Sequence, residues 1–123
     1  VAAGLGHVAV VRSLLESSPQ RPVVDKALHC AATFGAGTGV VRLLLEERGS
    51  PNFMLRARPR RRAVSIALRG FSIAYRLGRR SFLCAWAHHI HGSTPLHAAT
   101  SCGNWAEARA LLDGRADPNA RND

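Results

Sequence analysis

Apolar residues recur at helical spacing in three stretches of the chain. In each stretch the positions follow one another at steps of three, three and one residue. They are Val8, Val11, Leu14 and Leu15 in the first stretch, and Trp105, Ala108, Leu111 and Leu112 in the last. In the middle stretch they are Val41, Leu44 and Leu45, with Thr38 at the first position. This spacing places one apolar stripe on the surface of an α-helix. The pattern therefore predicts an amphipathic helix in each stretch.

The segments around these stripes also recur. LHCAATFG at residues 28–35 matches LHAATSCG at residues 96–103, and their final glycines stand 68 residues apart. That distance is two periods of about 33 or 34 residues, a spacing that is typical of repeat arrays. VVRLLLEERGSPN at 40–52 parallels ARALLDGRADPN at 108–119, and residues 2–16 form a partial copy. The sequence thus predicts a repeat protein.

These copies resemble the ankyrin repeat, in which a β-hairpin or turn precedes two antiparallel helices. The resemblance is specific over 92–119, good over 28–52 and partial over 2–16, and no motif is found over 53–91. It implies an all-α, helix-turn-helix solenoid of about four repeats, with the first truncated and the third degenerate. The expected units are a partial repeat at 1–20, a repeat at 21–52, a degenerate basic repeat or linker at 53–90, and a repeat with the start of the next hairpin at 91–123.

The motif positions have physical roles. Thr94 can cap a helix through its hydroxyl, and Pro95 suits the first helical position, where its missing N–H leaves no donor unpaired. A glycine at the end of the first helix can adopt a positive φ, so that the second helix folds back. By resemblance, the motif histidines are structural. The motif residues are Leu28, His29, Gly35, Thr94, Pro95, Leu96, His97 and Gly103.

The 21–52 copy departs from the family pattern. Lys26-Ala27 replaces Thr-Pro, so we expect its first helix to lack the cap. Leu15 and Leu28 are 13 residues apart where the family pattern implies about 17, so the preceding hairpin should be shortened. One extra residue lies between Gly35 and Val41, which should distort the turn between the helices. Arg48 and Arg115 stand where the pattern has a glycine, so a strained or re-registered loop is expected at both positions.

The net charge of +9 is confined to one segment. Residues 53–92 hold nine arginines and no acidic residue, whereas the other eight basic residues of the chain are balanced by its eight acidic ones. Arginines cluster at Arg56, Arg58, Arg60, Arg61 and Arg62. Such a cluster can contact phosphate or an acidic protein, form a solvated loop, or act as a nuclear localisation signal.

Three interpretations of residues 53–92 stay open at this point. In the first, 63–69 and 71–77 are two helices of a third repeat, separated at Gly70. In the second, Val64, Leu68, Phe71 and Tyr75 lie along one continuous helix opposite three arginines, so that a basic amphipathic element could lie on an acidic surface. In the third, the segment was never selected for folding, as would follow from reading noncoding or out-of-frame sequence.

Signs of chemistry are weak. Cys84, His88, His89 and His91 suggest zinc, but no second close pair completes a tetrahedral site, so we expect a polar loop there and no metal or other cofactor. Phosphate-loop, nucleophile-elbow and metalloprotease motifs are not found. The chain is therefore predicted not to be an enzyme.

A protein-interaction module is the predicted function. It is expected to bind another protein, of unknown identity, through hairpin tips and the concave face of the first helices. The family's recognition positions correspond to Thr33, Phe34, Ser93, Ser101 and Cys102. The alternative is binding of nucleic acid or an anionic surface by arginines within 56–80. Three cysteines without CxxC spacing, and the lack of a leader or membrane-span pattern, favour an intracellular location, cytoplasmic or nuclear. The opening Val1 and the hairpin start at the other end suggest a piece of a longer chain.

Overall fold

The computed structural model describes residues 7–56, 62–78 and 92–121, and within these ranges it is helical. One isolated antiparallel bridge joins Leu55 and Ser93. The expected all-α class is confirmed. The helices are α1 Val8–Glu16, α2 Arg21–Phe34, α3 Thr38–Glu46, α4 Arg62–Arg76, α6 Pro95–Ser101 and α7 Trp105–Asp113.

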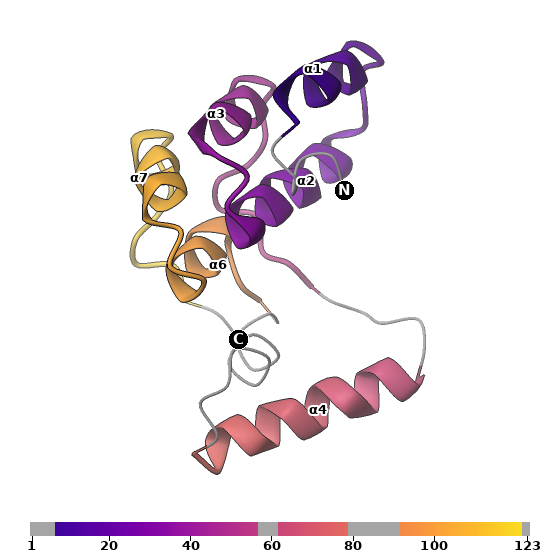
Figure 1. The fold of residues 1–123 in the computed structure, drawn as a ribbon, viewed down its shortest axis with the longest axis vertical. Helices are drawn as coiled ribbons and strands as arrows, with labels where there is room; N and C mark the ends of the chain where they lie inside the picture. Colours follow the sequence, from indigo (N-terminus) through magenta and orange to yellow (C-terminus); the bar gives the residue numbers. More distant parts are fainter. Residues whose placement is uncertain (1–6, 57–61, 79–91, 122–123) are drawn as a thin grey trace.

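The helices other than α4 form two layers. Helices α1, α3 and α7 lie side by side in one layer, and α2 and α6 lie side by side in the other (Figure 1). Helix α2 also packs on α3, and α6 packs on α7, so each layer covers the apolar face of the other. This is the helix-turn-helix solenoid that the repeats predict.

The core lies between the layers. Leu28, Leu44 and Leu111 are almost completely buried there, in keeping with the helical stripes. Small side chains, Ala31, Ala32 and Ala99 among them, are also buried and let neighbouring helices approach closely. Some residues of the stripes are exposed, because α1 and α7 are the outermost helices of their layer. These residues are Leu14, Trp105 and Leu112.

The 21–52 repeat stacks directly on the repeat that begins near residue 91. Helix α2 packs on α6 and α3 packs on α7, so no helix of the described residues stands between the two helix pairs. The interpretation of 53–90 as a third repeat stacked between them is therefore wrong. The two repeats are neighbours because the buried faces of α2 and α3 are complementary to those of α6 and α7.

Residues 56–91 are an insertion in the loop between these repeats. The Leu55 N–H donates to the Ser93 carbonyl and the Gly92 N–H donates to the Leu55 carbonyl, each at 2.9 Å, so the chain leaves and returns at one place. The described part of the insertion is α4, which lies apart from the stack (Figure 1).

Helix α4 runs without a break through Gly70. The interpretation as two helices separated there is wrong, and the single continuous helix is confirmed. Glycine within a helix costs only about 1 kcal/mol relative to alanine, less than the helical hydrogen bonds that a break would remove.

The helix caps match the motif. Thr94 is the N-cap of α6 and forms a capping box with His97, and Pro95 occupies the first turn. Gly35 and Gly103 end the first helices with φ of 65° and 75°. Arg48 and Arg115 adopt positive φ, at 65° and 68°, which confirms the strain expected from replacing glycine.

The 21–52 repeat absorbs its departures locally. Helix α2 has no side-chain cap, as predicted, and it begins at Arg21 with Pro22 in its first turn, well before Lys26. The helix thus occupies part of the shortened hairpin. Both Gly35 and Gly37 have positive φ in the turn between α2 and α3, which accommodates the extra residue.

Candidate functional site

A buried histidine links the two stacked repeats. His29 Nε2 on α2 is hydrogen bonded to the Ser93 hydroxyl at 2.9 Å, and Nδ1 lies 3.4 Å from the Thr33 hydroxyl. The Thr33 hydroxyl also donates to the His29 carbonyl at 2.8 Å. A neutral imidazole can satisfy both ring contacts because one nitrogen donates and the other accepts. His29 is therefore structural, as the resemblance implies.

The pKa of His29 is lowered from an ordinary 6.5 to about 4, mainly by burial and also by nearby His97, while a hydrogen bond with Ser93 opposes this shift. The unfolded chain therefore binds a proton at His29 between those two pH values while the folded chain does not. Stability from this group is complete above pH 6.5 and is lost as the pH falls toward 4.

We therefore expect the free energy of unfolding to fall by roughly 2–3 kcal/mol more between pH 7 and pH 4 than in a His29→Gln variant. Urea unfolding followed by circular dichroism at several pH values measures this difference. Taking the difference from the variant removes the contribution of carboxylates that titrate in the same range. Equal slopes for wild type and His29→Gln would contradict the assignment.

A second set of hydrogen bonds joins the repeats at the ends of their helices. The Asn104 amide donates to the carbonyls of Ala32 and Thr33 at 2.8 and 3.0 Å. These carbonyls belong to the last turn of α2, where backbone carbonyls have no hydrogen-bond donor within the helix. The buried Glu107 carboxylate accepts a hydrogen bond from Gly37 N–H at 2.9 Å. One repeat thus completes the helix end and turn of the other.

The loops that follow α3 and α7 are joined in the same way. Asn52 accepts a hydrogen bond from the Asp117 N–H at 2.7 Å. Within the 21–52 repeat, Asp25 on α2 accepts one from the Ser50 N–H at 2.7 Å. Asp117 also accepts from the Asn119 N–H at 2.9 Å. The side chains of Asn52, Asn104 and Glu107 therefore order the stack. Sequence reasoning missed them, although Asn52 and Asn119 recur in the matched loop segments.

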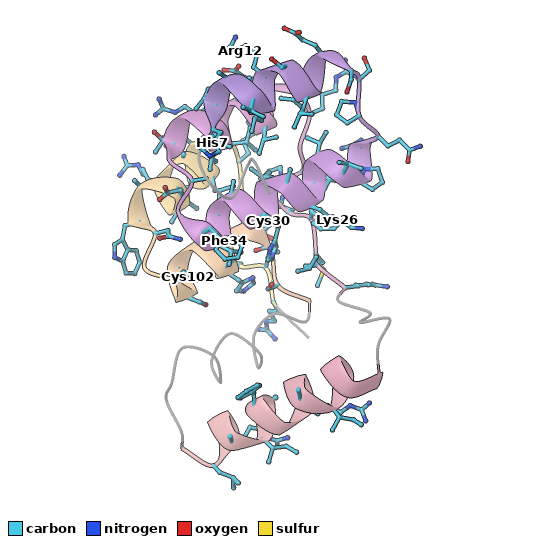
Figure 2. All side chains as sticks on the ribbon, turned by 45° about the vertical axis from the view of Figure 1, so that its right-hand side comes forward. His7, Arg12, Lys26, Cys30, Phe34 and Cys102 are labelled. Carbon is cyan, nitrogen blue, oxygen red and sulfur yellow. The ribbon has the colours of Figure 1, made fainter. Side chains whose placement is uncertain are left out.

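Helix α2 presents an exposed row of side chains that its packing does not use. Lys26, Cys30 and Phe34 follow one another at steps of four residues, and all three are exposed, with 69% of Phe34 accessible. Figure 2 shows them along α2, with Cys102 nearby at the end of α6. Cys102 holds the same repeat position as Phe34. We call Lys26, Cys30, Phe34 and Cys102 the first-helix face.

The structure divides the predicted recognition residues into two groups. Phe34 and Ser101 are exposed and Cys102 is half-buried, and burial raises the pKa of the Cys102 thiol. Thr33 and Ser93 are buried against His29 and engaged with it. They offer almost no side-chain surface to a partner, so they do not belong to the candidate contact surface. Lys26 and Cys30 replace them on the basis of their exposure.

The described residues include part of the predicted basic patch and none of the cysteine and histidine cluster. Arg56 is exposed at the base of the insertion and Arg62 begins α4. Arg58, Arg60 and Arg61 lie outside the described residues, as do Cys84, His88, His89 and His91. Among the described residues no group of three or more potential metal ligands comes together.

An apolar groove of about 500 Å³ lies along α6 and α7, lined by Leu96, Trp105 and Leu112 among others. Leu112 holds the repeat position of Leu45, and a Cβ added to Gly114 would lie 2.6 Å from Leu45 Cδ1. Leu45 thus packs against the other repeat in the stack. The groove accordingly corresponds to the surface that one repeat uses to contact another.

Comparison with known protein families gives one match. The ankyrin repeat family model matches residues 91–123, which include α6 and α7. Neither the curated proteins nor the solved structures include a match to the chain. Residues 91–123 therefore match the ankyrin repeat, and the stacked helix pairs and the Thr94 capping box are similar to that repeat.

Proposed function

We propose that this chain binds another protein through the first-helix face. Ankyrin repeats generally mediate protein–protein interaction and are typically without enzymatic activity. The observation that carries the proposal is Phe34, a large apolar side chain with 69% of its surface exposed on a helix whose other faces are packed. Aromatic side chains are enriched among the residues that dominate binding energy at protein interfaces.

The other members of the first-helix face suit a mixed contact. Lys26 adds a positive charge one turn before Cys30, and Ser101 and Cys102 continue the surface from α2 onto the end of α6. The hydrogen bonds of His29 and Asn104 hold the two helices in register, so the face is formed before a partner arrives. Preorganisation of this kind lowers the entropic cost of binding.

Phe34→Ala should weaken binding of a protein partner at least tenfold, because it removes the central apolar contact. Proteins retained by the immobilised chain are identified by mass spectrometry, and one is purified for titration calorimetry against each variant. Val10→Ala, a change at a half-exposed apolar residue on α1, is the matched control and should alter affinity less than twofold. If both variants bind as tightly as wild type, the contact lies elsewhere on the chain.

The alternative, anionic partners of the arginine-rich segment, is favoured by one specific observation. Arg56, Arg69 and Arg76 are exposed in a segment that carries no acidic residue. Salt distinguishes the two modes, because an arginine-driven contact weakens steeply with ionic strength and a first-helix-face contact weakens much less.

We also propose that the chain is intracellular, either cytoplasmic or nuclear. Cys30 and Cys102 are free thiols, which suits a reducing compartment such as the cytoplasm or nucleus. None of the helices in the described residues is long and apolar enough to cross a membrane. A fluorescent fusion of the chain, imaged in cells, tests the location.

A further inference from the structure

Helix α4 exposes a row of large apolar side chains to solvent. Ile66, Phe71 and Ile73 on α4 have exposed fractions of 70%, 41% and 56%, and Leu77, directly after the helix, has one of 81%. Helix α4 is not among the helix pairs that pack extensively on one another in the described residues. Among the described residues, the apolar side chains of this helix therefore do not belong to the core cluster of the repeat stack.

These side chains are segregated on the helix. At about 100° per residue, Ile66, Ala67, Phe71, Ile73 and Ala74 fall within an arc of about 160°. Arg69 and Arg76, both exposed, lie together outside that arc. Helix α4 thus has a wide apolar face and a narrower basic face.

A helix of this kind gains stability from a surface that covers its apolar face. Isolated helices of about 15 residues are marginal in water, because few backbone hydrogen bonds offset the cost of nucleation. Helix α4 spans Arg62–Arg76 and has no packed partner among the described helices. A surface that binds α4 must therefore be apolar where it covers the apolar face. It must also carry negative charge, because residues 53–92 hold nine arginines and no acidic residue.

We propose that α4 binds the surface of an anionic lipid bilayer. The apolar arc enters the boundary between headgroups and acyl chains, and the arginines contact anionic headgroups. At 15 residues, α4 is too short to span the bilayer and lies in its plane instead.

A bilayer fits α4 better than nucleic acid does. Nucleic acid would neutralise Arg69 and Arg76 but leave Ile66 and Ile73 in water. Proteins that bind single strands instead combine basic residues with several stacking aromatics, whereas most apolar residues of α4 are aliphatic and its aromatic residues are Phe71 and Tyr75.

The base of the insertion lets α4 act without disturbing the repeats. Leu55 and Ser93 hold the two ends of the insertion together, so the first-helix face keeps its structure while α4 contacts lipid. This proposal specifies the anionic-surface alternative above and does not depend on the first-helix face. Variants of α4 should leave Phe34-dependent protein binding unchanged.

The first test is co-sedimentation of the full chain with vesicles. We expect at least tenfold tighter binding to phosphatidylcholine vesicles rich in phosphatidylserine than to pure phosphatidylcholine. Arg69→Gln with Arg76→Gln should remove that preference, and Ile66→Asp with Ile73→Asp should abolish binding to both vesicle types. Val10→Asp with Leu14→Asp makes the same chemical change on α1 and should bind like wild type. Equal binding to both vesicle types, or an equal loss in the α1 variant, would overturn the proposal.

The second test resolves the two faces of the helix. Cys30, Cys84 and Cys102 are changed to serine, and a fluorophore sensitive to polarity is attached through Ala67→Cys or Ser72→Cys. With phosphatidylserine vesicles the emission at position 67, in the apolar arc, should shift to the blue, and the emission at position 72 should not. Circular dichroism confirms that the labelled chains keep their helices. Binding of single-stranded RNA that needs Arg69 and Arg76 but tolerates the isoleucine changes, without a shift at position 67, would assign α4 to nucleic acid.

Discussion

Leu28→Ala should lower the free energy of unfolding by about 2–5 kcal/mol, the usual cost of truncating a buried leucine. Leu28 has no exposed surface and lies in the core cluster between the two helix layers. The substitution removes apolar contacts and leaves a cavity that α2, held on both sides by α3 and α6, cannot easily close. Urea unfolding followed by circular dichroism measures the change.

Val23→Ala is the matched control, because Val23 lies on the same helix with 56% of its surface exposed. Its effect should stay within about 0.5 kcal/mol, as for most surface substitutions. Unfolding that is equally sensitive at both positions would mean that α2 is not packed as the structure shows.

Gly35→Ala should destabilise the chain more than Gly103→Ala, by about 1–3 kcal/mol, although both glycines hold the same repeat position. Both have positive φ, which costs any residue with a Cβ about 1–2 kcal/mol. A Cβ on Gly35 would also lie 2.9 Å from Asn104 Oδ1, whereas one on Gly103 meets no atom within 4 Å. Alanine at position 35 therefore displaces Asn104 from the carbonyls of Ala32 and Thr33.

The difference between the two glycine variants reports the contact between repeats, because the backbone strain is common to both. Urea unfolding of each variant in the wild-type and Asn104→Ala backgrounds completes the measurement. In the Asn104→Ala background the two glycine substitutions should cost nearly the same. A difference that persists without the Asn104 side chain would place its cause outside this contact.

The features that the sequence predicted correctly arise from interactions between near neighbours in the chain. The capping box needs only Thr94 and His97, three residues apart, and the positive φ of Gly35 and Gly103 follows from the need to end a helix. The apolar stripes depend on spacing within one helix. Each of these features could be predicted because the residues that cause it lie within a few positions of one another in the sequence.

The order of the stack could not be predicted in this way. The insertion at 56–91 is close to one repeat period in length, so the glycine spacing still equals two periods and suggests a repeat between. Only the packing of α2 on α6 shows that these repeats are neighbours. Length alone cannot distinguish an insertion in a hairpin from a degenerate repeat, because both separate the motifs equally.

By itself, the sequence determined the helices of the repeats, their caps, their turns and the family resemblance, because short-range hydrogen bonding and apolar spacing specify all four. The tertiary structure decided which repeats touch, and with that it decided which residues face a partner. Thr33 and Ser93 are buried because His29 brings them together across the boundary between repeats, while Phe34, next to Thr33, is left exposed. Burial depends on contacts between residues more than sixty positions apart, and these contacts form only when the helix pairs stack.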